Sequence, residues 1–333
     1  MKRVVVFALL AVVLDWGIGG MLDVLYRRTF TGERGGLTNF ALAKDADVLV
    51  LGSSRAQYQV MPSVLQEKLS LTAFNAGLKG HDFLYSVLLF DLWKQAHAAP
   101  RAALLQVDIE SLLERGRELE GAQLLAPYLD ESPLVREVLY SADPFKRYEY
   151  WSRAYRFNGK AFSIARNLFT QPDLAADGFI PALGTLNPAT DPVAVNALDQ
   201  DRTAMEQAQL PFSDTKLRYL RDLAVYGGQH GMRLILFHTP LYGQDPLAHD
   251  AWAGRIRSLA ADLSIDFIDI CEATHPHVFR DKPALYNDAN HLNSHGAVIY
   301  TNLLADELKA RLGSNVDARL GEPAATARAQ ALN

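Results

Sequence analysis

Residues 46–51 read Ala46-Asp47-Val48-Leu49-Val50-Leu51, and Gly52 follows them directly. A short apolar run that ends at a glycine is typical of a strand buried on both faces, as in a parallel sheet. Four further runs have the same character, and they cover residues 71–75, 102–109, 233–238 and 265–270. The sequence therefore predicts a sheet of five parallel strands.

Amphipathic helical patterns separate most of these runs. They cover residues 82–97, 215–226, 249–263 and 294–313, with Ser294 as the expected N-cap of the last helix. Alternating strands and helices imply a parallel sheet with helices on both faces. We expect an α/β protein with a flavodoxin-like three-layer α/β/α sandwich, in which ligands bind beyond the carboxyl ends of the strands.

One long segment interrupts the alternation. Residues 110–214 separate the third strand from the next helix, which is too long for a simple connection. Helical patterns cover residues 111–124, 133–139 and 148–168, whereas residues 171–192 are rich in Pro, Asp, Gly and Asn and predict a loop. We expect a helical insertion over residues 111–213. It either caps the active edge of the sheet or packs as a separate module without contact to the site.

The N-terminus carries a membrane signal. Lys2 and Arg3 precede the apolar run 4–14, and apolar character resumes after Asp15 as far as Tyr26. Such a segment is either a cleavable signal peptide or an uncleaved signal anchor over residues 1–28, because 23 residues suffice to cross a bilayer. A carboxyl group within the span costs roughly 2.5–3.5 kcal/mol, which the apolar residues can offset. We favour the anchor, and both interpretations place the α/β domain, residues 40–312, outside the cytoplasm.

Composition excludes other classes of protein. A formal charge of −5 without any Lys/Arg-rich run argues against nucleic-acid binding. The single cysteine, Cys271, excludes an intrachain disulfide and a cysteine-based metal site. Residues 314–333 are rich in Ala, Gly and Arg without apolar periodicity, which predicts a disordered tail.

Two glycine-containing turns carry candidate chemistry. The first strand ends in Gly52-Ser53-Ser54-Arg55, and a serine at a strand-to-helix corner exposes its hydroxyl and can offer its N–H to an oxyanion. The second strand is followed by the turn from Asn75 to Gly80, where the Gly80 N–H is a second candidate donor. Taken alone, each turn is better explained as an ordinary connection between a strand and a helix.

A third motif indicates that these turns belong to one site. Asp288-Ala289-Asn290-His291 precedes the last helix, and a carboxylate three residues before a histidine can orient the imidazole. In the predicted fold this loop returns to the edge where the first strand ends. The sequence therefore predicts a catalytic triad of Ser54, His291 and Asp288.

A metal site is the weaker interpretation of the same region. Asp288, His291 and His295 have plausible ligand spacing, and His275 and His277 lie upstream. No second ligand pair accompanies them, and His295 falls in the first turn of a helix, so we expect neither a metal nor another cofactor. Two other histidines, His81 and His238, lie close enough to the predicted edge to touch a substrate.

The three motifs resemble the blocks of the SGNH/GDSL hydrolase superfamily over residues 46–112 and 214–312. The resemblance implies that Ser54 is the nucleophile and Gly80 an oxyanion donor. The third block of the family is missing, because residues 106–110 read Gln-Val-Asp-Ile-Glu and lack its asparagine. We expect either that Asn75, Arg55 or a group from the insertion replaces that donor, or that the transition state is stabilised more weakly.

A closer resemblance is to membrane-anchored bacterial SGNH-like proteins with a long central insertion, including relatives of D-alanine-transfer and alginate-acetylation proteins. Residues 48–56, 155–158, 177–181 and 291–293 carry it. It implies a single-pass inner-membrane protein with a periplasmic or extracellular domain, acting as a serine esterase or O-acyltransferase on acylated polysaccharide or another small ester. Polysaccharide-export or acetylation machinery is the expected protein partner.

Two rival functions follow from the same sequence. A non-catalytic envelope protein that binds glycan or a membrane partner is favoured by the missing third-block asparagine. A flavodoxin-like module facing the cytoplasm is disfavoured, because no phosphate-binding glycine loop follows the first strand.

Overall fold

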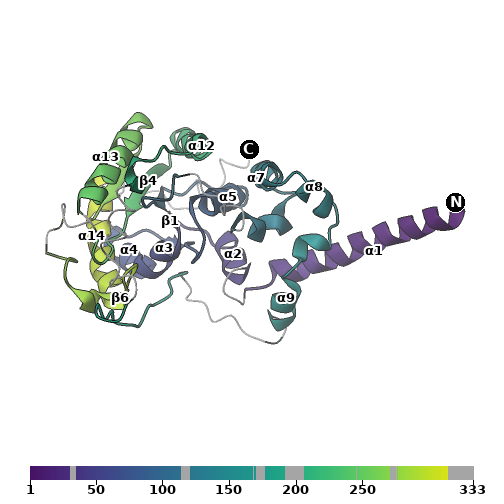
Figure 1. Ribbon diagram of the computed structural model, residues 1–333, viewed down its shortest axis with the longest axis horizontal. Coiled ribbons are helices and arrows are strands. Elements are labelled where there is room, and N and C mark those ends of the chain that lie inside the picture. Colours follow the sequence, from purple (N-terminus) through teal and green to yellow (C-terminus); the bar gives the residue numbers. More distant parts are fainter. Residues whose placement is uncertain are drawn as a thin grey trace.

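A five-stranded sheet forms the centre of the molecule (Figure 1). The computed structural model describes residues 1–30, 35–113, 121–167, 169, 177–191, 206–244, 246–270, 275 and 277–313, so Cys271 and the predicted tail lie outside the described residues. The strands are β1 (Val48–Leu51), β2 (Ala73–Asn75), β3 (Ala102–Gln106), β4 (Arg233–His238) and β5 (Asp266–Asp269). All neighbours pair in parallel in the order β2-β1-β3-β4-β5, which is the flavodoxin-like order and confirms the predicted fold class.

Helices cover both faces of the sheet, which explains why the strands are apolar without alternation. Leu49 and Leu51 of β1 face a core shared with α5 (Phe83–Trp93), α12 (Asp214–His230) and α13 (Pro246–Asp262). Val48 and Val50 face the opposite core, which contains residues of α3 (Ser54–Gln59), α4 (Pro62–Leu69) and α14 (Ser294–Leu312). The sheet is therefore the middle of three layers.

The predicted end of the third strand and the predicted N-cap of the last helix are wrong, and a side-chain hydrogen bond explains each difference. The third strand ends at Gln106 rather than at residue 109, because the Asp108 N–H donates to Ser111 Oγ (2.8 Å) and the chain turns. The N-cap of α14 is Asn293 rather than Ser294, since Asn293 Oδ1 accepts hydrogen bonds from the N–H groups of His295 and Gly296 (3.1 Å each).

The loop predicted before the last helix is instead a small hairpin. Strands β6 (Tyr286–Asp288) and β7 (His291–Leu292) pair antiparallel, with Asp288 opposite His291. The 3-10 helix η3 (Pro283–Leu285) leads into this hairpin. The turn between the strands is closed by the Asn290 N–H, which donates to Asp288 Oδ1 (2.9 Å).

The described part of the insertion divides into a helical piece and an extended piece. Its helical elements are η1 (Gln123–Tyr128), α7 (Pro133–Ala142), α8 (Lys146–Glu149), η2 (Tyr155–Phe157) and α9 (Ala161–Asn167). Of these, η1 and α7 contact α5, while η2 and α9 contact the N-terminal helix α1 (Lys2–Arg27). Residues 177–191 contain neither helix nor strand, in agreement with the predicted loop.

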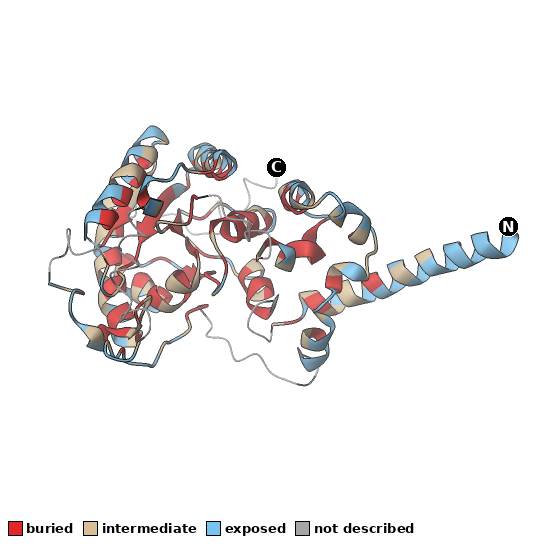
Figure 2. Cartoon of the chain, in the orientation of Figure 1, coloured by how far each residue is buried: buried red, intermediate tan, exposed pale blue. Residues whose placement is uncertain are grey.

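Helix α1 projects from the body of the molecule (Figure 1). It is long and apolar enough to cross a membrane, and nearly all of its N-terminal half is exposed (Figure 2). Its C-terminal end is anchored by Tyr26, which is fully buried against Tyr128 and Phe157. The short helix α2 (Gly35–Leu42) then leads to β1 and contacts α5.

Candidate active site

Ser54 lies where the sequence places it, at the first residue of α3 directly beyond β1. The chain turns at Gly52, whose φ of +148° disfavours a side chain, and a Cβ there would lie 2.5 Å from Gln106 Cβ. Ser53 caps the helix by accepting from the Arg55 N–H (3.3 Å), and its hydroxyl donates to Gln106 Oε1 (2.7 Å). The corner that presents Ser54 is therefore fixed by packing and by hydrogen bonds.

The three predicted triad residues meet. Ser54 Oγ lies 2.8 Å from His291 Nε2 although the two residues are 237 positions apart in the chain. On the other side of the ring, His291 Nδ1 lies 2.8 Å and 3.0 Å from the two carboxylate oxygens of Asp288. A proton on Nδ1 donates to Asp288 and leaves Nε2 free to accept from the serine hydroxyl.

Asp288 is held as a carboxylate. Its partial burial would raise the pKa of the carboxyl, but hydrogen bonds from His291, Asn287 and the Asn290 N–H outweigh burial and lower that pKa to about 2. The Asn287 side chain donates to Asp288 Oδ2 at 2.8 Å. Asp288 is thus ionised at neutral pH and oriented toward the imidazole.

Helix α3 also positions the histidine hairpin, which the sequence analysis did not anticipate. The ring of Tyr58 meets the His291 imidazole edge to face, with centroids 5.4 Å apart. Gln59, which is fully buried, donates from Nε2 to the Asn290 carbonyl oxygen (3.2 Å). Consecutive residues of α3 therefore hold the His291 imidazole and its hairpin. No motif marks them, because their role depends on which loop packs against the helix.

Two backbone N–H groups are candidates for binding an oxyanion. Gly80 has a φ of +75°, and its turn is held beside the Ser54 corner because the Leu78 N–H donates to the Gly52 carbonyl oxygen (2.9 Å). The Lys79 N–H donates to Oε1 of the buried Gln57 of α3 (3.1 Å). Within the described residues, the N–H groups of Ser54 and Gly80 have no hydrogen-bond partner.

Asn75 does not act as the predicted oxyanion donor. Its Nδ2 donates to the carbonyl oxygens of Ala56 and Val60 (2.7 Å each), and its Oδ1 accepts from the Gly77 N–H (2.9 Å). Both amide hydrogens are therefore used, and the side chain is buried. Asn75 instead ties the end of β2 to α3, so the prediction of a donor at this position is wrong.

The position of the missing third block is occupied by an ion pair. Asp108 Oδ2 lies 3.5 Å from Arg55 Nη2, and Asp108 Oδ1 accepts from the Ser111 hydroxyl (3.1 Å). Burial would raise the pKa of Asp108, but the neighbouring Arg55 and the hydrogen bonds hold it below its ordinary value. The Asp108 carboxylate is thus ionised, with its charge offset by Arg55.

The two additional histidines near the edge are buried. His81 Nδ1 donates to the Lys79 carbonyl oxygen (3.0 Å), and the ring packs on Tyr85. His238 is bonded to the Val107 carbonyl oxygen (3.1 Å), and burial together with the neighbouring His249 lowers its pKa to about 4. These imidazoles support the sheet edge rather than open onto it.

The insertion reaches the site through its extended piece. The Asn75 N–H donates to the Asp177 carbonyl oxygen (2.8 Å), and the Gly184 N–H donates to Asn287 Oδ1 (2.8 Å). Because Asn287 also bonds Asp288, this segment braces the triad carboxylate from outside the hairpin. Gly121 approaches the other side of the site, where a Cβ would lie 3.2 Å from His81 Cδ2. The insertion is therefore not a separate module without contact to the site.

In the described part of the chain, no three His, Cys, Asp or Glu side chains are grouped so as to hold a metal ion. No protein-family model matches the chain, and no curated protein matches it in sequence. The chemical interpretation of the site is thus built on its geometry.

Proposed function

We propose that this protein is a membrane-anchored serine esterase or O-acyltransferase of the SGNH type. The observation that carries the proposal is the continuous contact from Ser54 Oγ to His291 Nε2 (2.8 Å) and from His291 Nδ1 to Asp288 (2.8 Å). A hydroxyl, an imidazole and an ionised carboxylate in this order form the arrangement that activates a serine for acyl transfer.

In the proposed reaction, Ser54 Oγ attacks the acyl carbonyl carbon while His291 Nε2 takes the hydroxyl proton. The N–H groups of Ser54 and Gly80 stabilise the oxyanion that forms. The imidazolium then gives its proton to the departing alcohol, which leaves an acyl group on Ser54. Water or a sugar hydroxyl next attacks this ester, with His291 again as base, and the choice between them separates hydrolysis from transfer.

Arg55 is the best candidate to replace the missing asparagine. Its Nη1 is buried but makes no hydrogen bond to any described residue, while its Nη2 faces Asp108. A buried donor without a partner is costly, and a substrate oxygen would satisfy it. Arg55, the residue that follows Ser54, therefore combines neutralisation of Asp108 with an N–H that no described residue uses.

The proposed substrate class is an acyl ester of an envelope or secreted polysaccharide. It is supported by the resemblance to membrane-anchored polysaccharide-modifying proteins and by the apolar helix α1, which would hold the site at the outer face of a bacterial inner membrane.

A fluorophosphonate probe, which phosphonylates activated serines, tests the mechanism. We expect the full-length protein to be labelled and Ser54→Ala to abolish labelling. Ser258→Ala is the matched control, because that hydroxyl is on α13 and bonds only its own helix at Gly254 (3.1 Å). Undiminished labelling of Ser54→Ala would rule out Ser54 as the nucleophile.

The rival function is a non-catalytic envelope protein that binds glycan or a membrane partner, favoured by the acidic Asp108 in place of the third-block asparagine. Turnover of p-nitrophenyl acetate separates the two proposals. We expect the wild type to exceed Ser54→Ala and His291→Ala by several orders of magnitude. Equal rates in all three proteins would support the binding protein.

A further inference from the structure

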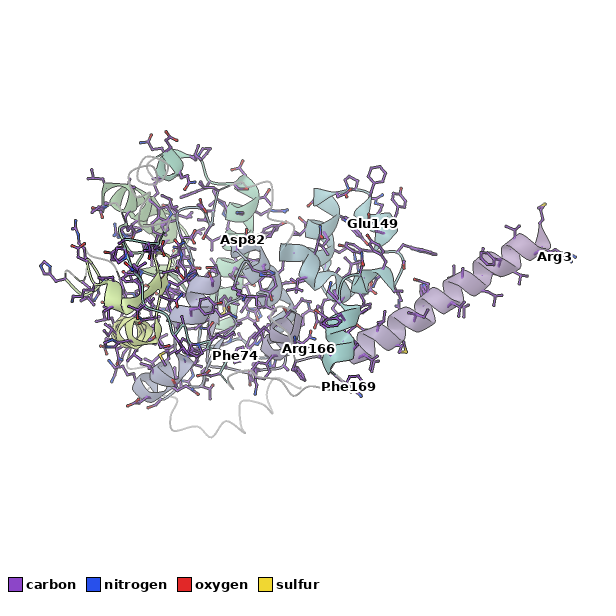
Figure 3. All side chains as sticks on the ribbon, turned by 60° about the horizontal axis from the view of Figure 1, so that its bottom comes forward. Arg3, Phe74, Asp82, Glu149, Arg166 and Phe169 are labelled. Carbon is purple, nitrogen blue, oxygen red and sulfur yellow. The ribbon has the colours of Figure 1, made fainter. Side chains whose placement is uncertain are left out.

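The helical piece of the insertion, whose elements η2 and α9 contact α1, exposes five large aromatic side chains. This aromatic patch consists of Phe145, Tyr148, Trp151, Phe162 and Phe169, whose exposures are 72%, 69%, 61%, 80% and 87%. All five lie within residues 143–169, the segment whose elements η2 and α9 contact α1. Figure 3 shows Phe169 and Arg166 close to the base of α1. Single exposed apolar side chains are ordinary on a protein surface. Five of them within a stretch of 25 residues, in a segment that contacts a membrane-type helix, mark a binding surface.

The same segment binds α1 at Asp15, which is the only acidic residue of the helix before Asp23. The Asp15 carboxylate accepts hydrogen bonds from Ser152 Oγ (2.5 Å) and from the Arg153 N–H (2.9 Å). The Arg153 guanidinium lies 4.3 Å above the Trp16 ring. Gly19 permits this contact, because a Cβ there would lie 2.3 Å from Arg153 Cβ. The turn at residues 152–154 is therefore seated against the middle of the helix.

The contact at Asp15 leaves too little free helix before it for α1 to cross the bilayer with the whole insertion outside the membrane. Residues 2–14, which precede Asp15, rise about 20 Å at about 1.5 Å per residue. The hydrocarbon core of a bilayer is about 30 Å thick, and tilting the helix shortens its reach further. A helix that crosses the bilayer must therefore carry the turn at 152–154 into it.

The rest of α1 agrees with a deeper position. Beyond Asp15, α1 still exposes the apolar side chains of Ile18, Met21 and Val24, with exposures of 47%, 57% and 51%, and Trp16 remains 49% exposed beneath Arg153. The exposed apolar side chains continue to Val24, which is 20 residues from Val4 and so about 30 Å along the axis. Lipid contact with them requires the neighbouring insertion residues to lie at the same depth.

The charge and the residue types of this segment indicate which layer of the bilayer it contacts. Residues 143–169 contain six Lys or Arg side chains and two Asp or Glu side chains, a net charge of +4 within a chain whose total is −5. Trp and Tyr concentrate at the boundary between lipid headgroups and acyl chains, and basic side chains bind anionic headgroups. The aromatic patch therefore has the composition of a surface that enters lipid at headgroup depth.

We propose that residues 143–169 are embedded in the leaflet nearer the α/β body of the bilayer that α1 crosses. The turn at 152–154 then lies below the headgroups, and the aromatic and basic side chains lie at the headgroup boundary, with phospholipid covering the aromatic patch. The protein is then held at two points, the helix and the insertion, so that the α/β body has a fixed height and orientation above the membrane. This inference is independent of the chemistry at Ser54.

Spin-label accessibility in the full-length protein tests the proposal. Cysteine is introduced as Phe162→Cys or Phe145→Cys in a Cys271→Ser background, and each protein is reconstituted alone into phosphatidylcholine–phosphatidylglycerol vesicles. The matched control is Leu183→Cys, an equally exposed apolar position (84%) in the extended segment next to the histidine hairpin. These side chains are exposed, so the substitutions preserve the fold, and unchanged circular dichroism verifies it.

We expect labels at positions 162 and 145 to relax with lipid-soluble oxygen and to be shielded from an aqueous nickel complex, with the reverse at position 183. Access of nickel at positions 162 and 145 equal to that at 183 would overturn the proposal. The vesicles contain no other protein. Equal nickel access would therefore also be expected if a protein partner, rather than lipid, covers the aromatic patch in the cell.

Discussion

Replacement of Asp288 by asparagine separates the orientation of His291, the proposed catalytic base, from the stability of the fold. Asp288 contributes both carboxylate oxygens to His291 Nδ1, at 2.8 Å and 3.0 Å. An amide of the same shape presents an N–H where an acceptor is needed and favours the tautomer that places the proton on Nε2, facing Ser54. In serine-protease triads the same exchange lowers kcat about 10⁴-fold, and each factor of ten is worth about 1.4 kcal/mol, so we expect a loss of about 5.5 kcal/mol of transition-state stabilisation.

The cost in folding stability is expected to be much smaller. The fall in the pKa of Asp288 from its ordinary 3.8 to about 2 corresponds to about 2.4 kcal/mol, at about 1.4 kcal/mol for each tenfold change in proton binding. Because the side chain is 35% exposed, solvent screening reduces this to about 1 kcal/mol. Since the folded-state pKa is depressed, this contribution is present above about pH 4 and is lost as the pH falls toward 2.

The assay compares turnover of p-nitrophenyl acetate with urea unfolding at pH 7 and at pH 2–4 for Asp288→Asn. Asp306→Asn is the control, because Asp306 is 63% exposed and its ion pair with Lys68 (2.8 Å) is superficial, so both readouts should stay close to wild type. The reasoning is refuted if Asp288→Asn retains activity within about tenfold of wild type, or if its activity is lost only in proportion to its unfolding.

Two further substitutions test the surroundings of the site. Gly178→Ala should destabilise the protein by about 3 kcal/mol or more in urea unfolding, since Gly178 has a φ of +83° and a Cβ would lie 2.0 Å from the Asn75 carbonyl oxygen. Gly159→Ala, at a φ of +76° with open space around the Cβ, should cost only about 1 kcal/mol, and equal losses would contradict the steric account. Arg55→Gln should lower the free energy of unfolding at pH 7 by about 2 kcal/mol, because it leaves the Asp108 carboxylate without its cation. Adding Asp108→Asn should recover part of this loss, and an additive double variant would show that the two groups are not coupled.

The fold was accessible from sequence because its signal is local. A strand covered by helices on both faces must be apolar at every position, and residues 48–51 meet that condition without any knowledge of their neighbours. Residues 234–237 of β4 meet the condition too, and the predicted bounds of this strand match the structure. The third strand was predicted too long, since Val107 and Ile109 are apolar and only the side-chain contact of Asp108 with Ser111 shows where the chain turns.

The chemical residues of the triad were also legible, because a serine after a buried strand and a carboxylate three residues before a histidine are short-range patterns. The residues that support the triad could not be predicted from the sequence. Gln59 and Asn287 are unremarkable in the sequence, and they matter because one reaches the Asn290 carbonyl oxygen and the other bridges Gly184 to Asp288. Asn75 was misassigned for the same reason, since the sequence cannot show that the carbonyl oxygens of Ala56 and Val60 already take both of its amide hydrogens.

The sequence by itself determined the α/β class, the apolar character of the N-terminal helix and the residue types at the triad positions, because each follows from spacing along a few neighbouring residues. Only the tertiary structure decided that Ser54 and His291 lie 2.8 Å apart, that Arg55 pairs with Asp108, and that Asp15 is bound by the turn at residues 152–154. Hydrogen bonds and ion pairs act over a few ångströms in space, and the partners that satisfy them here are separated by about fifty to more than two hundred residues of chain.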